Sequence, residues 1–308
     1  MPEHRPLLTR RRLLLGGMTA AGAVALARGL RFSPAGLLPF TSTTAAMADP
    51  IATIALGDPK ATHLGNPGAG TRHHPVGMDF HERKWPFDQL GTVRYSQGPH
   101  SFEVSRVPSV RGSFDRDQPE RGIYAWSISA FPMAGDTIPH ALARDELFRL
   151  FERLHQAGWR RYIDVGDPRL SGRQTMRYFV EKQGNYSPDP AYVPTLDEWM
   201  RLNEDLPYWQ FWADGTYMQI RVIDEPALRN PKRPGVYLFA ITIESESAYG
   251  YAYFKEVEDM LRWKELLPAE LRRLHKLRVA EEAEVVQRGY TIDTSYQDPP
   301  ILALRTGA

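Results

Sequence analysis

The segment YWQFWADGTYMQIRVI, residues 208–223, is the stretch from which the fold is most directly read. Asp214-Gly215 is a favoured two-residue hairpin turn, because both of its positions require a positive φ. That turn sets the register of two strands, with Trp212 opposite Tyr217. Because side chains alternate between the two faces of a strand, one face of the hairpin is apolar and is expected in the core. That face holds Trp209, Phe211, Met218, Ile220 and Val222.

The other face of this hairpin is the main candidate for a binding surface. Each residue of this face carries an aromatic, amide or guanidinium group. The residues are Tyr208, Gln210, Trp212, Tyr217, Gln219 and Arg221. Tyrosine, tryptophan and arginine anchor protein interfaces, because they bury a large area and still offer a polar tip. Three interpretations stay open for this face: a protein-binding surface, a platform on which sugar rings stack, or a second core layer covered by other parts of the chain.

Three tyrosines further along the chain have the spacing of one strand face. They are Tyr249, Tyr251 and Tyr253, and they follow a strand expected over 235–244. We expect them to extend the aromatic surface of the hairpin. Glu244 and Glu246 lie just before them and are expected to keep a sheet edge solvated.

Outward from the hairpin, the elements expected before it alternate between strand and helix. Residues 123–131 and 159–165 are rich in β-branched and aromatic residues, which is typical of strands. Between them, a helix capped by Asp136 or Thr137, with Pro139 in its first turn, is expected to end at Gly158. This order predicts a strand-helix-strand crossover between two parallel strands.

Further helices are expected over 172–183, after Thr195, and at the end of the chain. Thr195 and Glu198 have the spacing of a capping box. Residues 255–267 and 269–288 show helical spacing, with a break at Pro268. The predicted fold class is α+β: a mixed, mainly antiparallel sheet of roughly four to six strands, with helices packed mostly on one side.

Four segments are expected along the chain. Residues 1–48 resemble an export signal. Residues 49–120 contain many turn-forming Gly and Pro residues and are predicted to be a loop-rich, extended lead-in, with short strands over 91–95 and 101–107. Residues 121–290 form the α+β core domain, and 291–308 a loosely held C-terminal tail.

The first 48 residues carry the features of a targeting segment. Arg10 and Arg11 follow Thr9 and precede a third arginine and an apolar run, residues 13–27. The run reaches roughly 22 Å as a helix, less than the ~30 Å needed to cross a bilayer, so no permanent membrane span is expected. Ala46 and Ala48 are the small residues that a signal peptidase requires, which places cleavage between Ala48 and Asp49. This segment resembles a twin-arginine (Tat) signal peptide.

That resemblance implies a bacterial protein exported in the folded state by the Tat translocase. The expected location is the periplasm or beyond. Because the chain has no cysteine, a lipoprotein anchor is excluded, as are disulfides and thiolate metal sites.

The net charge of +1 over 308 residues conceals an uneven distribution. Residues 1–48 hold six arginines and one acidic residue, so residues 49–308 carry a net −4. Nucleic-acid binding is therefore not expected, because neutralising phosphates requires a basic surface.

One cluster of histidines is a candidate metal site, and no cofactor is predicted beyond it. His63, His73, His74 and His81 lie within one short, Gly- and Pro-rich stretch, and imidazole suits zinc, copper or iron. The alternative is a polar loop in which histidines happen to gather.

Two acidic groups are weaker catalytic candidates. Asp115, Asp117 and Glu120 form one, and Asp164 and Asp167 the other; paired carboxylates at a suitable distance hydrolyse glycosides. The sequence contains no G-x-S-x-G elbow and no phosphate-binding glycine fingerprint. No catalytic residue is assigned.

The sequence favours a non-enzymatic periplasmic protein that binds another protein. Immunity proteins that neutralise secreted toxins, such as type VI secretion effectors, are similar in kind, since they are exported and bind with acidic and aromatic surfaces. The alternative is a Tat-exported hydrolase, dependent on a metal or on carboxylates, that acts on envelope polymer or polysaccharide. A structural or assembly factor of the envelope is a third class, which the sequence does not separate from the first.

Overall fold

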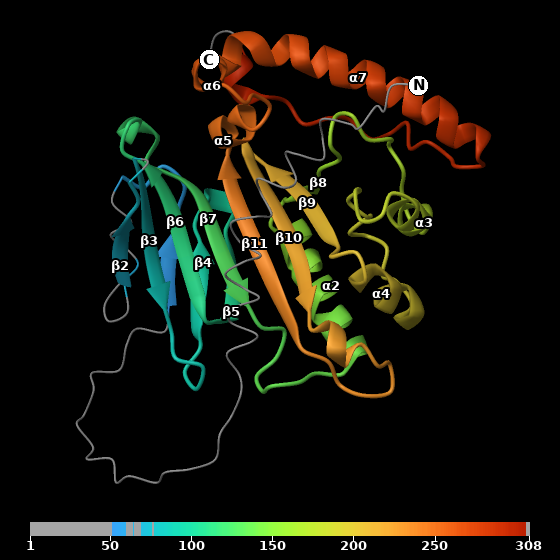
Figure 1. The fold of residues 1–308 in the computed structure, drawn as a ribbon, viewed down its shortest axis with the longest axis horizontal. Helices are drawn as coiled ribbons and strands as arrows, with labels where there is room; N and C mark the ends of the chain where they lie inside the picture. Colours follow the sequence, from blue (N-terminus) through green and yellow to red (C-terminus); the bar gives the residue numbers. More distant parts are fainter. Residues whose placement is uncertain (1–50, 60–63, 65–68, 76, 306–308) are drawn as a thin grey trace.

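The computed structural model describes residues 51–59, 64, 69–75 and 77–305. Its main feature is a large sheet with the strand order β2-β3-β6-β7-β11-β10-β9-β8, in which every neighbouring pair is antiparallel (Figure 1). In that order, the strands span Ala69–His73, Met78–Lys84, Ser109–Asp115, Ile123–Ala130, Tyr237–Ser245, Thr216–Asp224, Tyr208–Ala213 and Arg160–Arg161. A smaller sheet joins β1 (Ile51–Ile54), β4 (Gly91–Tyr95) and β5 (Phe102–Val107).

The hairpin β9–β10 has the predicted register. Trp212 lies opposite Tyr217, and Ala213 lies opposite Thr216. Asp214 and Gly215 have φ values of 42° and 72°, the left-handed conformation that this turn requires. All five residues of the apolar face are in the main hydrophobic cluster, so the prediction for that face is confirmed.

The helix α2 (His140–Gln156) joins two strands that run in the same direction. These strands are β7 and β8, and three antiparallel strands separate them in the sheet. The helix begins later than predicted, with Pro139 as its N-cap. The reason is a β-bridge between Ile138 and Gly235, which keeps the chain extended up to that point. Gly158 follows the helix with a φ of 82°, as expected of a helix terminator.

The smaller sheet and the helices α2, α3 (Gln174–Glu181) and α4 (Leu196–Asn203) contribute to one hydrophobic cluster with the large sheet. Figure 1 shows α2 and β4 behind the large sheet, with α3 and α4 continuing the helical layer beyond β9. The capping box at the start of α4 is present, with both of its hydrogen bonds. This architecture is the α+β class predicted from the sequence.

Residues 51–120 are part of this core, which corrects the prediction of a decorating lead-in. They supply the whole smaller sheet and three strands of the large one. The predicted strands over 91–95 and 101–107 are β4 and β5. β2 and β3 were missed because polar residues alternate with few apolar ones in them, so the strand pattern is weak there.

Three helices lie across one end of the large sheet: α5 (Glu246–Tyr251), α6 (Val257–Leu261) and α7 (Trp263–Gln287) (Figure 1). The predicted break at Pro268 is wrong, because this proline lies inside α7. It is in the second turn, where it removes one backbone N–H donor without ending the helix. The chain breaks instead at Arg262, between α6 and α7.

The segment after α7 runs back along the end of the sheet (Figure 1). Its described part, up to Arg305, is not loosely held. The Tyr296 hydroxyl accepts a hydrogen bond from the Ile163 amide (2.8 Å), and the amides of Leu302 and Ala303 donate to the Glu246 carboxylate (2.6 Å each). Among the residues that the structure describes, no helix has both the length and the apolar character to cross a bilayer.

Candidate functional site: a tyrosine-walled pocket

The polar face of the hairpin is covered over much of its area. Tyr208, Gln210 and Tyr217 are buried, with exposed fractions of 1%, 9% and 5%, whereas Trp212, Gln219 and Arg221 are partly exposed. The Gln210 carbonyl accepts a hydrogen bond from the Tyr162 amide (2.9 Å). Of the three interpretations of this face, a second packed layer describes most of it.

Three tyrosines form the centre of that layer. The rings of Tyr217 and Tyr249 are stacked, with centroids 3.7 Å apart and an interplanar angle of 5°. Tyr162 meets both rings edge to face. The hydroxyl of Tyr249 is hydrogen-bonded to that of Tyr162 and to that of Tyr253. These contacts make a rigid aromatic cluster, around which Trp212 and Ile301 also pack.

The cluster joins residues from three separate elements. Tyr217 is near the start of β10, Tyr162 directly follows β8, and Tyr249 is in α5. The tyrosine series was predicted to be a strand, but the Ser245 hydroxyl accepts from the Ala248 amide (3.3 Å) and caps a helix at this point. Tyr253 follows α5 in a turn that keeps it on the same side as Tyr249, and the two hydroxyls are hydrogen-bonded.

Tyr251 consequently lies on another side of α5. Its hydroxyl donates to the side-chain oxygen of Gln118 (2.6 Å), and the Arg121 guanidinium lies over its ring. The three tyrosines therefore do not form one surface, which corrects the sequence prediction.

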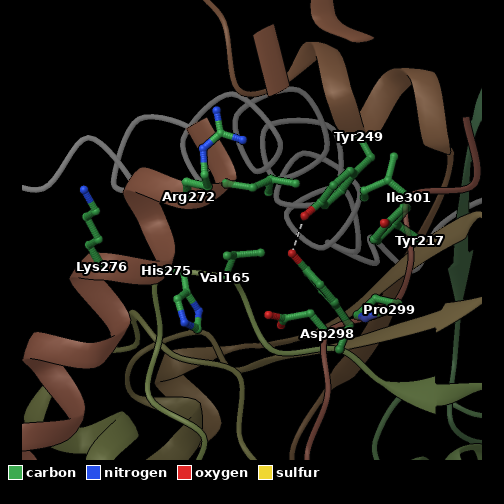
Figure 2. A pocket seen from close by; sticks show the side chains of 11 residues that line it. Val165, Tyr217, Tyr249, Arg272, His275, Lys276, Asp298, Pro299 and Ile301 are labelled. Carbon is green, nitrogen blue, oxygen red and sulfur yellow. Dashed lines mark hydrogen bonds between the residues drawn. The ribbon is translucent and has the colours of Figure 1, made fainter. Parts of the chain in front are cut away.

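A pocket of about 400 Å³ opens beside the cluster, between the end of the sheet, α5, α7 and the C-terminal segment. Its lining is Tyr162, Val165, Tyr217, Tyr249, Leu271, Arg272, His275, Lys276, Asp298, Pro299 and Ile301. Figure 2 shows the α7 side chains on one side of the pocket and Tyr217, Tyr249 and Ile301 on the other. Aromatic and aliphatic walls with a few polar groups are typical of ligand sites.

The α7 side of the pocket carries positive charge. Arg272, His275 and Lys276 are three and four residues apart, so they share one face of the helix. Within the described part of the chain, none of these three side chains takes part in a hydrogen bond or an ion pair.

Asp298, in the C-terminal segment, is held at the pocket by a buried arginine of α7. Arg278 is 2% exposed and donates to both carboxylate oxygens of Asp298 (2.7 and 2.9 Å). It also donates to the backbone carbonyls of Asp164 and Asp167 (3.0 and 2.8 Å). Burial alone would lower the pKa of Arg278, but the hydrogen bonds with Asp298 outweigh it and raise the pKa. The guanidinium thus ties α7 to the C-terminal segment and to the loop after β8.

A much smaller cavity, about 30 Å³, lies against the same three tyrosines. It is lined by polar groups of β9, β10 and β11, among them Gln210, Gln219, Thr242 and Glu244. Two of the residues predicted for partner binding, Gln210 and Gln219, are therefore at a cavity large enough for one or two waters.

The histidine cluster is only partly described. His63 lies outside the described residues. His73 is exposed and its ring is hydrogen-bonded to Asp79 (2.8 Å), while the His81 ring is bonded to the Thr71 hydroxyl (2.9 Å). Within the described ranges, no group of three or more His, Asp or Glu side chains is arranged to hold a metal ion.

Both acidic groups lie in local turns. The Asp167 amide donates to the Asp164 carbonyl (2.8 Å), and the Asp117 amide donates to the Asp115 carboxylate (2.9 Å). The export residues Arg10, Arg11, Ala46 and Ala48 all lie outside the described residues.

Sequence reasoning identified Tyr217 and missed most other residues of the pocket. The usable signals were the spacing of Arg272, His275 and Lys276 on one helix face and the helical spacing of Tyr249 and Tyr253. No local signal marks Tyr162, Asp298 or Ile301, because their meeting depends on the whole fold.

The fold and the site define an α+β protein with an aromatic pocket between the end of a sheet and a long helix. No protein-family model, no curated protein and no solved structure matches the chain.

Proposed function

We propose that this chain is an exported bacterial protein that acts by binding, and that the tyrosine-walled pocket is its binding site. The observation that carries the proposal is the pocket itself, about 400 Å³ with largely aromatic and aliphatic walls. A ligand that fills it gains stability by removing those walls from water.

The rigidity of the walls also supports binding. Tyr249 is fixed by two hydroxyl contacts and one ring stack, and Asp298 is fixed by Arg278. A site whose side chains are already ordered loses little conformational entropy when a ligand arrives.

A neutral ring-bearing dye, N-phenyl-α-naphthylamine, provides a direct test. Its fluorescence is expected to rise saturably at one site per chain. The Ile301→Phe variant, which fills the pocket, should abolish that signal. Val279→Phe is the matched control, because Val279 is exposed on α7 and does not line the pocket. Equal binding by wild type and Ile301→Phe would refute the pocket as the site.

Export is the second part of the proposal, and the sequence at Thr9–Leu15 supports it. Changing Arg10 and Arg11 together to Lys should leave the protein in the cytoplasmic fraction. Arg12→Lys, at the free position of the motif, should not alter its location. Periplasmic recovery of the double variant would contradict the twin-arginine route.

An immunity role is a separate form of the binding proposal, in which a protein partner contacts the exposed part of the hairpin face. The net −4 of residues 49–308 and the partly exposed Trp212 and Arg221 support a protein partner. The test is the gene neighbourhood, followed by co-expression with any secreted toxin encoded there. Growth rescue by the wild type is expected; no rescue, or no neighbouring toxin, would remove this role and leave pocket binding to be judged separately.

A further inference from the structure

We propose that the tyrosine-walled pocket binds an amphipathic anion: a ring or compact apolar body with one anionic head group, such as a carboxylate, phosphate or sulfate. This rests on the proposed binding function and adds the chemical class of the ligand.

The first argument compares two cations that line the pocket, Arg272 and Lys276, with four other arginines in and beside α7. Arg262 and Arg273 are paired with glutamates three residues away on the same chain. Arg278 is paired with Asp298, and Arg288 with Glu181. Arg272 and Lys276, which line the pocket, have no acidic partner among the described residues. Unpaired cations at the mouth of a pocket favour a ligand that brings the negative charge.

The second argument is the charge balance of the lining. Among the described residues, Asp298 is the one acidic residue that lines the pocket, and Arg278 already neutralises it through two hydrogen bonds. Arg272 and Lys276 therefore leave the lining with a net positive charge.

The third argument is the position of these charges relative to the apolar walls. Figure 2 shows Arg272, His275 and Lys276 extending from α7 on one side of the pocket, and Tyr217, Tyr249 and Ile301 on the other side. A ligand that satisfies both sides places an apolar body against the rings and its anionic head against α7. A neutral apolar molecule uses only one side, and an inorganic anion only the other.

Two dyes that share one ring system separate these possibilities. Anilinonaphthalene sulfonate carries an anionic head, whereas N-phenyl-α-naphthylamine is its neutral counterpart. Wild-type protein is expected to bind the sulfonate about tenfold more tightly than the neutral dye, since each rim cation contributes a few-fold. Added salt should weaken binding of the sulfonate only.

The variant for the test is Arg272→Gln with Lys276→Gln. Both side chains are exposed, so folding should be retained. Affinity for the sulfonate is expected to fall about tenfold, to that of the neutral dye, whose affinity should not change. Lys264→Gln is the matched control, because Lys264 is an exposed α7 cation outside the pocket and should leave both affinities unchanged.

The outcomes distinguish this inference from the function on which it rests. If both dyes bind wild type equally and the double variant changes neither affinity, the preference for an anionic ligand is refuted, while the pocket remains the proposed site. If neither dye binds saturably, or if Ile301→Phe leaves both affinities intact, the pocket itself is refuted.

Discussion

The two faces of the β9–β10 hairpin are both largely buried, yet they are built differently. One face packs apolar groups such as Phe211 and Ile220 into the main cluster with α2 and the smaller sheet. The other packs Tyr217 against Tyr162 and Tyr249, and the hydroxyl groups of Tyr162 and Tyr249 are hydrogen-bonded to each other. The first face is filled, and the second leaves a pocket. The difference indicates that the first face supplies stability and the second positions groups around a cavity.

The largest effect is expected from Phe211→Ala on the filled face. Phe211 is 3% exposed, and its ring packs on that of Phe151, with centroids 5.2 Å apart. The substitution should lower the free energy of unfolding by about 3–5 kcal/mol, because it leaves a cavity in a close-packed core. Denaturant unfolding followed by fluorescence measures this. The neighbouring Trp212→Ala on the other face should cost clearly less, since Trp212 is partly exposed; an equal cost would remove the distinction between the faces.

A smaller effect is expected from Tyr249→Phe, which keeps the ring stack and removes one hydroxyl. That hydroxyl is bonded to those of Tyr162 and Tyr253. We expect a loss of about 1–2 kcal/mol in unfolding free energy, the usual size for a buried hydrogen-bonding group. Tyr251→Phe provides the comparison within the same helix, because it removes one hydroxyl that is bonded outside the cluster, to Gln118. A Tyr249→Phe protein as stable as wild type would show that the hydroxyl network is not stabilising.

Glu246→Gln tests the connection between α5 and the C-terminal segment. The carboxylate accepts from the amides of Leu302 and Ala303, and Gln keeps only one acceptor oxygen. We expect about 1 kcal/mol of lost stability and faster hydrogen exchange at those two amides. Glu284→Gln makes the same charge change at an exposed position of α7 and should leave both amides protected.

The smallest effect is the pH dependence that Glu282 of α7 contributes to stability. Burial would raise the pKa of Glu282, but hydrogen bonds from the side chain and amide of Arg169 outweigh it and lower the pKa below its ordinary 4.5. A lowered pKa means that Glu282 stabilises the fold above pH 4.5 and that this contribution is lost as pH falls through the folded-state pKa.

Comparing two variants at neutral and acidic pH measures this dependence. The stability difference between wild type and Glu282→Gln should shrink on acidification, whereas the cost of Phe211→Ala should stay constant. A Glu282→Gln cost that does not change with pH would contradict the assignment.

The hairpin was predictable because its information is local. Asp214-Gly215 determines the turn, the turn determines the register, and the register determines the faces. The capping box at Thr195 and Glu198 was predictable for the same reason. In each case, residues a few positions apart in sequence are also in contact.

The pocket was not predictable, because its walls come from segments far apart in the chain. Tyr162, Tyr217 and Ile301 meet only after the sheet, α5 and the C-terminal segment have packed. The tyrosine series failed for another reason. Spacing by two fits a strand, but the pair Tyr249 and Tyr253 also fits a helix, and the Ser245 cap decides for the helix. Pro268 was misread because one missing N–H near a helix start does not end a long helix.

The wide separation of the pocket walls has a consequence for biosynthesis. The ribosome synthesises the chain from its N-terminal end. All strands of the large sheet have been synthesised once the chain reaches Ser245, the last residue of β11. The pocket still lacks α7 and the wall at Asp298–Ile301 at that stage. A nascent chain therefore contains all strands of the large sheet before it contains the walls of the pocket, so folding of the sheet does not depend on a molecule in the pocket.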